Sequence, residues 1–344
     1  MLLRRNPLLT VLAFFILGQL LLGLFLYHNW QIKQAMHQEQ QVHLVETAYQ
    51  AAVSSYRLAS EVYVDEVIRQ PEVLRLLEEG YLADSPEAQA IARGRLYRHL
   101  WPSYASLSQQ HLRQLHFHDP LGYSYLRFLQ PQRWGDNLAA QRLSVARMLA
   151  ERAPVATFEA GRSLTGFRYL FPLAWPAQDA ITPLISELGS VELSIPFRAL
   201  QEWMHELDPS QEYQLYLDRQ HLASKVSHDF FSLYTAQLHP DLLVENAQLD
   251  LPGAPLPPSL AVQRLHLQLT EHAKIQRLTQ ATQPLVITQR LDRQSWTVVF
   301  LPVLDHQGQA VAYIGAYRPD PFADALRQDF WLYGWGATGL LLAM

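Results

Sequence analysis

An uncharged apolar stretch near the N-terminus constrains this chain most. Residues 6–32 contain no Asp, Glu, Lys or Arg, and residues 7–27 are almost wholly apolar. At about 1.5 Å rise per residue, a helix of that length crosses a hydrocarbon layer of roughly 30 Å. A cleaved signal peptide would have a shorter apolar region and a small-residue cleavage site, whereas large residues continue through this stretch. We therefore expect residues 1–29 to contain an uncleaved membrane anchor. Arg4 and Arg5 precede the apolar stretch, so the positive-inside rule places the N-terminus in the cytoplasm.

A second uncharged apolar run starts after Asp329 and continues to residue 344. We expect residues 329–344 to be the start of a second transmembrane helix in a chain that continues into the cytoplasm. Residues 30–328 would then form one extracytoplasmic insert, long enough for one large or two ordinary domains. The chain has no cysteine, which fits an oxidising compartment, and its net charge of -5 with three lysines provides no basic face for nucleic acid. Two spans around such an insert are typical of a receptor, and DNA or RNA binding is not expected.

Residues 30–110 have a helical pattern, which we interpret as a stalk followed by helices of the first module. Seven apolar residues recur at alternating three- and four-residue spacing: Val42, Val45, Tyr49, Ala52, Tyr56, Ala59 and Tyr63. This stripe predicts a long helix from the membrane to Pro71, whose missing N–H ends it. Packing on a folded domain and a self-associating coiled coil both explain the stripe, and its length of about three heptads favours the domain. Ser85 and Pro86 suit the N-cap and first turn of a further helix.

Residues 111–208 and 209–328 are predicted to be two α+β modules with antiparallel sheets. In the first, β-prone runs on both sides of the turn "DPLG" predict a hairpin, and an amphipathic helix follows with Asp136 or Asn137 as its N-cap. The second half repeats the order strand, turn, glycine-led strand, Pro-Phe and helix, which indicates one module used twice. We also expect a helix over about residues 260–281. The fold class is therefore α+β.

Three segments of the first module carry a combination of motifs. They are, in order, "LRQLHFHDPLGYSYLRF", "PQRWGDNLAAQR" and "FEAGRSLTGFRYLFP". With the long helix from the membrane and the two consecutive modules, they resemble the double Cache sensor domains of bacterial transmembrane receptors, and in particular the subtype called double Cache type 3. The resemblance covers about residues 40–322 and is strongest over residues 111–197. It departs from the family at Phe128 and Leu129, where relatives often have a polar ring, and at Asn137, where they have an acidic residue.

The resemblance implies two tandem PAS-like modules in the periplasm, anchored in the bacterial inner membrane. It implies that the first, membrane-distal module binds a small polar metabolite, with arginines for a carboxylate, rings as walls and acidic residues for an ammonium group. The residues predicted to line this site are Arg127, Tyr125, Trp134, Asp136, Glu159, Arg162, Arg168 and His116. No cofactor is implied. The resemblance further implies a homodimer and a cytoplasmic diguanylate cyclase, histidine kinase or chemoreceptor signalling region.

The charged residues also have structural explanations. Asp136 could cap a helix, and Glu159 could pair with Arg168 to hold its hairpin together. His116 and His118 are two apart on a strand, as two metal ligands would need, but no third ligand is close to them in the sequence. Hydrogen-bonded histidines are therefore favoured over a metal site. No nucleophile elbow, phosphate-binding loop or Rossmann turn appears, so no enzyme is predicted in these residues.

The alternative from another class is a membrane-anchored periplasmic interaction protein that binds another envelope protein and no small molecule. It predicts that internal carboxylates use Arg127 and Arg168 fully. It also predicts no cavity between the sheet and its covering loops, and a broad exposed apolar patch instead.

Overall fold

The computed structural model describes residues 7–160, 165–176, 185–223, 232–247, 253–305 and 307–343. Its helices are α1 (Pro7–Tyr63), α2 (Pro71–Tyr81), α3 (Pro86–Gln109), α4 (Leu138–Gln141), α5 (Leu143–Glu151), α6 (Phe197–Leu207), α7 (Arg219–Ala223), α9 (Leu260–Leu269) and α10 (Pro321–Ala343). A π-helical turn covers Val64–Ile68 and a 3-10 helix covers Ile275–Gln280. The strands are β1 (Gln114–His118), β2 (Ser124–Arg127), β3 (Val155–Ala160), β4 (Thr165–Ala174), β5 (Glu187–Ile195), β6 (Glu212–Asp218), β7 (Tyr234–Gln237), β8 (His239–Glu245), β9 (Leu285–Leu291), β10 (Gln294–Leu304) and β11 (Ala310–Pro319).

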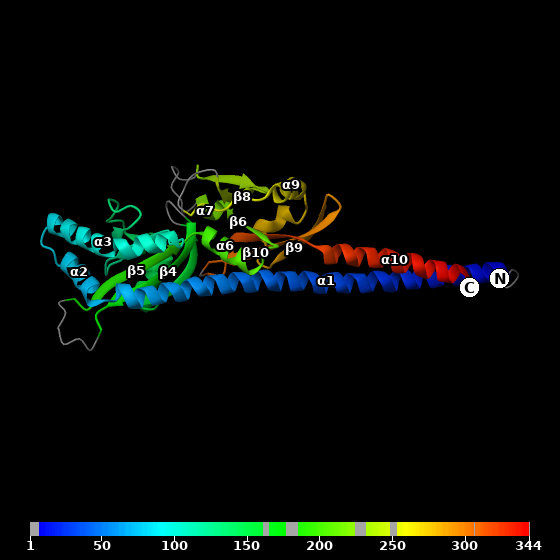
Figure 1. Cartoon of the computed structure of the whole chain (residues 1–344), viewed down its shortest axis with the longest axis horizontal. Helices are drawn as coiled ribbons and strands as arrows, with labels where there is room; N and C mark the ends of the chain where they lie inside the picture. Colours follow the sequence, from blue (N-terminus) through cyan, green and yellow to red (C-terminus); the bar gives the residue numbers. More distant parts are fainter. Residues whose placement is uncertain are drawn as a thin grey trace.

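Helix α1 runs the length of the molecule, and two sheet modules lie along it one after the other (Figure 1). Its N-terminal part lies beside α10, so both ends of the chain are at the same end of the molecule. Within the described residues, α1 is the one helix that is long and apolar enough to cross a membrane. The crossing of a membrane by α10 stays a prediction. The predicted helix toward Pro71 is confirmed, with the π-helical turn between the end of α1 and the start of α2.

The apolar stripe of α1 packs on the folded modules, as the sequence favours. Val45 and Ala52 are fully buried and Tyr63 at the predicted end of the stripe is buried, whereas Ala59 is exposed. The helix contacts β4 and α6 of the first module and β10 and α10 of the second. The Tyr169 hydroxyl donates a hydrogen bond to the backbone carbonyl of Val53 at 2.9 Å, which joins β4 to the helix.

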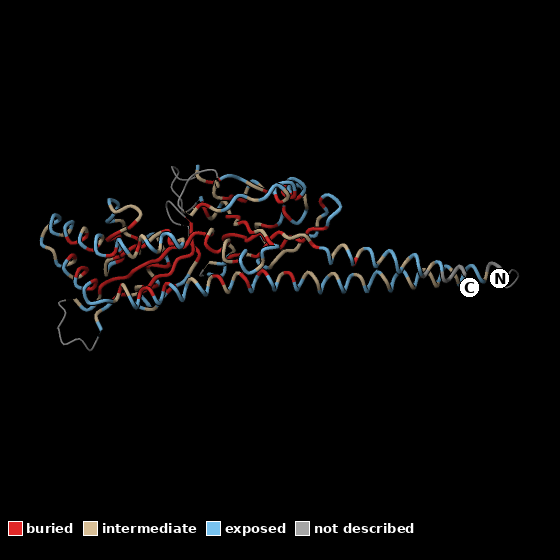
Figure 2. The backbone as a smooth tube through the Cα atoms, viewed as in Figure 1, coloured by how far each residue is buried: buried red, intermediate tan, exposed pale blue. Residues whose placement is uncertain are grey.

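The first sheet, called sheet 1 below, is antiparallel with the strand order β2-β1-β5-β4-β3. Because side chains alternate along a strand, one face of sheet 1 is apolar and carries Leu115, Phe117, Val191 and Leu193. These side chains belong to a core shared with buried residues of α1, α2 and α3. Figure 2 shows most strands of sheet 1 and the central strands of the second sheet buried, and the paired lengths of α1 and α10 mostly exposed.

The second sheet has the order β7-β8-β6-β11-β10-β9 and repeats the plan of sheet 1. In sheet 1, β5 lies between β1 and β4; in the second sheet, β11 lies between β6 and β10. Each central strand leads into a helix, α6 or α10, that starts at or beside a Pro-Phe pair. The predicted internal repeat is therefore present as a repeated strand order.

One long element predicted from the sequence is wrong in extent. The helix expected over residues 260–281 ends at Leu269, and a separate 3-10 helix follows at Ile275–Gln280. At the break, the Thr270 hydroxyl donates to the carbonyl of His266 at 2.8 Å, so the side chain competes for a helical acceptor. The β-branched Thr270 begins a turn over residues 270–274, and this turn ends a helix that apolar periodicity alone would continue.

Candidate functional site

The second face of sheet 1 is polar, although it is buried. Antiparallel register places His116 opposite Glu192, and Arg168 opposite Ser194, on this face. All four of these side chains are buried. The helices α4 and α5 follow β2 and precede β3, and α5 packs against β3 and β4. A polar layer therefore lies inside the first module, where each charge needs a partner.

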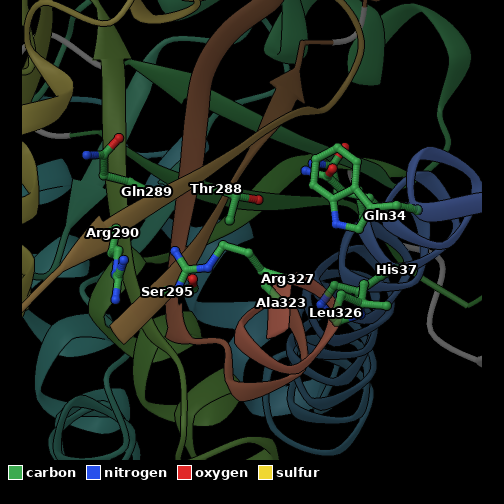
Figure 3. Close-up of a pocket in the computed structure, with 11 residues that line it drawn as sticks. Gln34, His37, Thr288, Gln289, Arg290, Ser295, Ala323, Leu326 and Arg327 are labelled. Carbon is green, nitrogen blue, oxygen red and sulfur yellow. The ribbon is translucent and has the colours of Figure 1, made fainter. Parts of the chain in front are cut away.

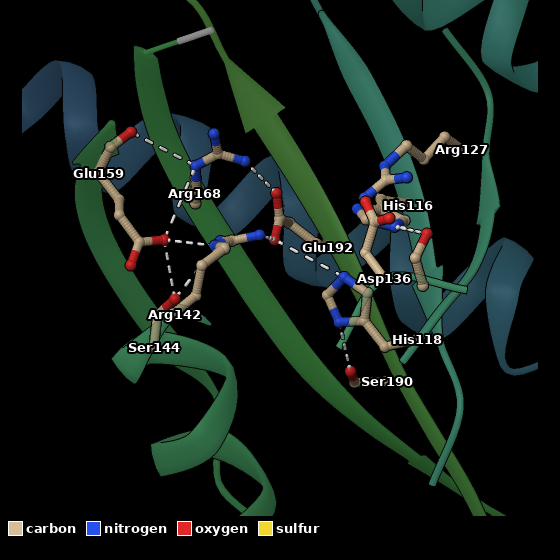
Figure 4. A network of polar contacts seen from close by, with 11 residues as sticks. His116, His118, Arg127, Asp136, Arg142, Ser144, Glu159, Arg168, Ser190 and Glu192 are labelled. Atoms are coloured by element: carbon tan, nitrogen blue, oxygen red, sulfur yellow. Dashed lines mark hydrogen bonds and ion pairs between the residues drawn. The ribbon is translucent and has the colours of Figure 1, made fainter. Parts of the chain in front are cut away.

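Glu192 is at the centre of this layer (Figure 4). Its two carboxylate oxygens accept from two guanidinium groups, Arg142 at 2.6 Å and Arg168 in a second short contact. Arg142 also donates to Glu159 at 2.7 Å, and the Ser144 hydroxyl donates to the same Glu159 oxygen at 2.9 Å. The acidic and basic groups therefore alternate, so that the buried charges balance.

The ion pairs determine the protonation of the central groups. Burial alone would raise the pKa of Glu192, but Arg142 and Arg168 hold that pKa well below its usual range. Burial alone would lower the pKa of Arg142, but Glu192 and Glu159 raise it. Both groups are therefore charged at neutral pH, and removing either partner would leave an uncompensated charge in the interior.

Arg127 and Asp136 form a neighbouring pair on the same side of the sheet (Figure 4). Arg127 donates to Asp136 at 2.8 Å and to the carbonyl of Arg133 at 2.8 Å. Asn137, and not Asp136, caps α4, because its side chain accepts from the amide of Ala140 at 2.9 Å. The capping alternative that the sequence left open for Asp136 is therefore wrong, and Asp136 is left to pair with Arg127.

Two predicted ring walls lie elsewhere. The Tyr125 ring lies 4.9 Å from the ring of Tyr81 on α2, and its hydroxyl is packed against Gly80. Trp134 is half exposed and stacks at 3.9 Å on the guanidinium of Arg93 on α3. Tyr125 therefore contacts α2 and Trp134 contacts α3, and neither ring contact involves the charged network on sheet 1. Arg162, also predicted for the site, lies outside the described residues.

The two residues that connect the network were missed. Arg142 is the last residue of the quoted motif "PQRWGDNLAAQR", and Glu192 is the one charged residue in the strand segment "SVELSI". A glutamate within an otherwise apolar or small strand segment is a usable signal, because such a residue is buried only when it is paired. The residues brought together from the prediction are Arg168, Glu159 and His116, with Arg127 and Asp136 beside them.

A pair of histidines borders Glu192. Nδ1 of His118 is 3.0 Å from the hydroxyl of Ser190, and Nε2 of His116 is 2.8 Å from the hydroxyl of Ser124. Burial lowers the pKa of His118 to about 3 and that of His116 well below its ordinary value. Both rings are therefore neutral at pH 7. Glu192 supplies the third donor that the sequence did not place near them, since donor atoms of the three residues all lie within 4.8 Å of one another.

A separate cavity of about 200 Å³ lies near the membrane end of the second module (Figure 3). It is lined by side chains of α1, β9, β10 and α10: Trp30, Gln34, His37, Gln38, Thr288, Gln289, Arg290, Ser295, Ala323, Leu326 and Arg327. The cavity therefore lies between α1 and α10 beside the second sheet. Any molecule bound in it would contact α1 and α10 at once.

Comparisons with known proteins return sensor structures at low similarity. No protein-family model and no curated protein matches the chain. An extracellular ligand-binding receptor from Desulfohalobium retbaense matches with 10% identity and a TM-score of 0.34, covering 79% of this chain and 39% of that one. The sensor domain of the V. cholerae histidine kinase DctB matches with 14% identity and a TM-score of 0.37, covering 82% and 99%. The sensory domain of the Campylobacter jejuni chemoreceptor Tlp3, with isoleucine bound, matches with 11% identity and a TM-score of 0.38, covering 88% and 97%.

The three matched proteins are described as a receptor or as sensor domains of a histidine kinase and a chemoreceptor. Every TM-score among the three lies below 0.5, so no residue role is carried over from them. The chemistry of the site rests on the contacts of this chain alone.

Proposed function

We propose that residues 30–328 are the extracytoplasmic ligand-sensing region of a bacterial inner-membrane signal transducer. Residues 111–208 would be the membrane-distal, ligand-binding module and residues 209–328 the membrane-proximal one. The ligand would be a small polar metabolite that carries a carboxylate. The observation that carries this proposal is the buried charged layer on sheet 1, within a module that packs on the long helix from the membrane.

The charged layer suits exchange with a charged ligand. Arg142 forms ion pairs with both Glu159 and Glu192. A ligand carboxylate could replace one of these partners while Arg142 keeps its ion pair with the other. Arg142 also precedes the first residue of α5, the helix that packs on β3 and β4. Exchange at Arg142 would therefore move the start of α5. A ligand that prefers one of the two arrangements tenfold supplies about 1.4 kcal/mol toward it.

The modules are connected to the membrane end by polar contacts along α1. The Tyr56 hydroxyl donates to the carbonyl of Ala199 on α6 at 3.3 Å, in the first module. Farther along the helix, His37 Nε2 is 2.7 Å from Asp320, directly before α10. A shift of the first module on α1 would therefore change how α1 and α10 lie against each other. That change is the proposed signal to a cytoplasmic diguanylate cyclase, histidine kinase or chemoreceptor region.

A homodimer is part of the proposal, and the free side of α1 supports it. Leu44, Leu58 and Val62 are each at least half exposed on this helix. Leu44 and Leu58 are two heptads apart, so they lie on one side of an α-helix that could pack on a second copy.

The test is a thermal-unfolding screen of the full chain in detergent or nanodiscs. Amino acids, organic acids, amines and nucleobases are added in buffer freed of metal ions. A ligand that binds only the folded state raises the melting temperature by mass action. We expect one chemical class with a carboxylate to raise it. The Arg127→Ala variant should lose this shift, and Arg133→Ala, at an exposed arginine in the loop after β2, should keep it.

The ion pairs that Arg127 and Arg168 each form with an internal carboxylate favour a second candidate function. Both arginines contact internal carboxylates, as the interaction-protein alternative predicts. A well-folded chain that responds to no compound in the library would favour that alternative. A large fall in melting temperature for Arg127→Ala, with ligand affinity unchanged, would show that this arginine is structural.

A further inference from the structure

Three buried groups at one end of the charged layer have the donor types of a metal site. His116 and His118 are on β1, and Glu192 is opposite them on β5. Their donor atoms lie within 4.8 Å of one another, and all three residues are buried. We propose that His116, His118 and Glu192 bind a divalent transition-metal ion, with Zn²⁺ as the reference ion. The site shares Glu192 with the network of the proposed function, but metal binding does not require a metabolite to bind.

The histidine rings are oriented as metal ligands are. In metal sites, the ring nitrogen that does not bind the metal is held by a hydrogen bond, which fixes the ring and its tautomer. Here Ser190 holds Nδ1 of His118, and Ser124 holds Nε2 of His116. Each ring therefore has one anchored nitrogen and a second nitrogen for a ligand.

The second nitrogen of His118 lacks a partner. Nε2 of His118 is fully buried and has no hydrogen-bond partner among the described residues. It faces a Glu192 oxygen at 3.9 Å, which is too long for a hydrogen bond. A buried polar atom in this position costs free energy unless something binds it. A metal ion between the nitrogen and the carboxylate would give Nε2 of His118 the partner that it lacks.

The geometry requires the donor atoms to approach one another. Zinc bonds of about 2.0–2.1 Å place two ligands of a tetrahedral ion roughly 3.3 Å apart. The pair His118 Nε2 and Glu192 is at 3.9 Å and all three donor atoms lie within 4.8 Å of one another, so the donors must approach by up to about 1.5 Å to bind a tetrahedral ion. Two imidazoles and one carboxylate favour Zn²⁺, Ni²⁺ or Cu²⁺ over Mg²⁺ or Ca²⁺, which prefer oxygen ligands. The fourth position would be left to water or to an added ligand.

The metal ion would compete with Arg142 for Glu192. Arg142 donates to the same Glu192 oxygen that faces His118, and it also pairs with Glu159. A cation at this oxygen would therefore weaken one contact of Arg142 while the contact with Glu159 remains. Because Arg142 precedes α5, metal binding and displacement of α5 would be coupled.

The experiment uses the full chain, purified without a histidine tag and stripped with a chelator. Equilibrium dialysis against Zn²⁺ with metal analysis by mass spectrometry gives the stoichiometry and affinity. We expect about one zinc ion per chain. His118→Asn keeps a donor near Ser190 but removes Nε2, and it should weaken binding by more than the roughly 10–100-fold loss typical of outer-shell changes. His99→Gln, at an exposed histidine of α3, is the matched control and should bind like the wild type.

Two results would overturn the site. One is that wild-type chain retains no zinc, and the other is that His118→Asn binds as tightly as the wild type. If His118→Asn does not fold, Co²⁺ bound to wild-type chain decides the matter. Strong visible absorption bands of a four-coordinate ion support the site, and the weak bands of a six-coordinate ion reject it. Since the metabolite screen is done without metal ions, success or failure there is independent of zinc binding.

Discussion

Replacing Glu192 with Gln should destabilise the first module strongly, because the carboxylate is the buried centre of its charged layer. The amide has nearly the same shape, so packing is kept and only the charge is lost. Arg142 retains Glu159 at 2.7 Å, whereas Arg168 loses its short buried contact with a carboxylate and keeps the Glu159 carboxylate at 3.9 Å and the Glu159 carbonyl at 3.4 Å. The variant therefore leaves one guanidinium group poorly compensated in the interior.

The magnitude follows from the number of contacts that remain. Removing one partner of a buried ion pair costs about 3–5 kcal/mol, and the second partner of Arg142 places this case near the lower end. About 3 kcal/mol corresponds to a fall of roughly 6–12 °C in melting temperature if the first module unfolds together with its helices as a unit of about 150–250 residues. Glu187→Gln is the matched control on the same strand, because Glu187 pairs with Arg152 at the exposed surface. That change should cost less than about 1 kcal/mol.

The assay is urea unfolding of both variants, followed by circular dichroism in a buffer with a chelator. The chelator ensures that no metal ion adds to the stability of the wild type. If the free energies of unfolding of the Glu192→Gln and Glu187→Gln chains agree within about 1 kcal/mol, the charged layer does not carry the stability argued above.

Three further outcomes are expected. Burial lowers the pKa of His266 to about 4, so the unfolded chain binds a proton at this residue more readily than the folded chain. The contribution of His266 to the free energy of unfolding should be complete above about pH 6.5 and fall by about 3 kcal/mol toward pH 4. His266→Gln should flatten that part of a urea-unfolding pH series. Gly189→Ala should be much more destabilising in a thermal melt than Gly308→Ala: both residues have positive φ, but only at Gly189 would the new Cβ meet a backbone oxygen, at 2.1 Å. Asp320→Ala removes the contact with His37, so spin labels on α1 and α10 should show a broader distance distribution, and an unchanged distribution would show that this contact does not hold the helices.

Local signals explain what could be predicted from the sequence. Ser85 caps α3 by accepting from the amide of Ala88 at 3.1 Å, as its residue type and position indicate. The hairpin around "DPLG" is also confirmed, because β-prone runs and turn residues lie within a few positions of one another. These features depend on neighbours along the chain, which the sequence displays directly.

Tertiary register explains what could not be predicted. Arg142 and Glu192 are fifty positions apart, and only the pairing of β5 with β1 and β4 brings Glu192 to the polar face. Tyr125 shows the same limit over a short distance. Period-two alternation would place it with Arg127, but the register shifts between Phe117 and His118, and its ring packs on α2. A bulge of one residue therefore removed a predicted wall from the site.

The shared helix connects the buried charged layer of sheet 1 with α10. Helix α1 has 57 residues, a length of about 85 Å at 1.5 Å per residue, and both modules contact it. Its distal end is the π-helical turn Val64–Ile68, a form that holds one extra residue in a helix and is often found at functional sites. Movement of sheet 1 can therefore be taken up at this turn without breaking the helix. Because α1 also contacts α10, such movement would change the relation of the two helices. Under the proposed function, that relation is what a cytoplasmic region would detect.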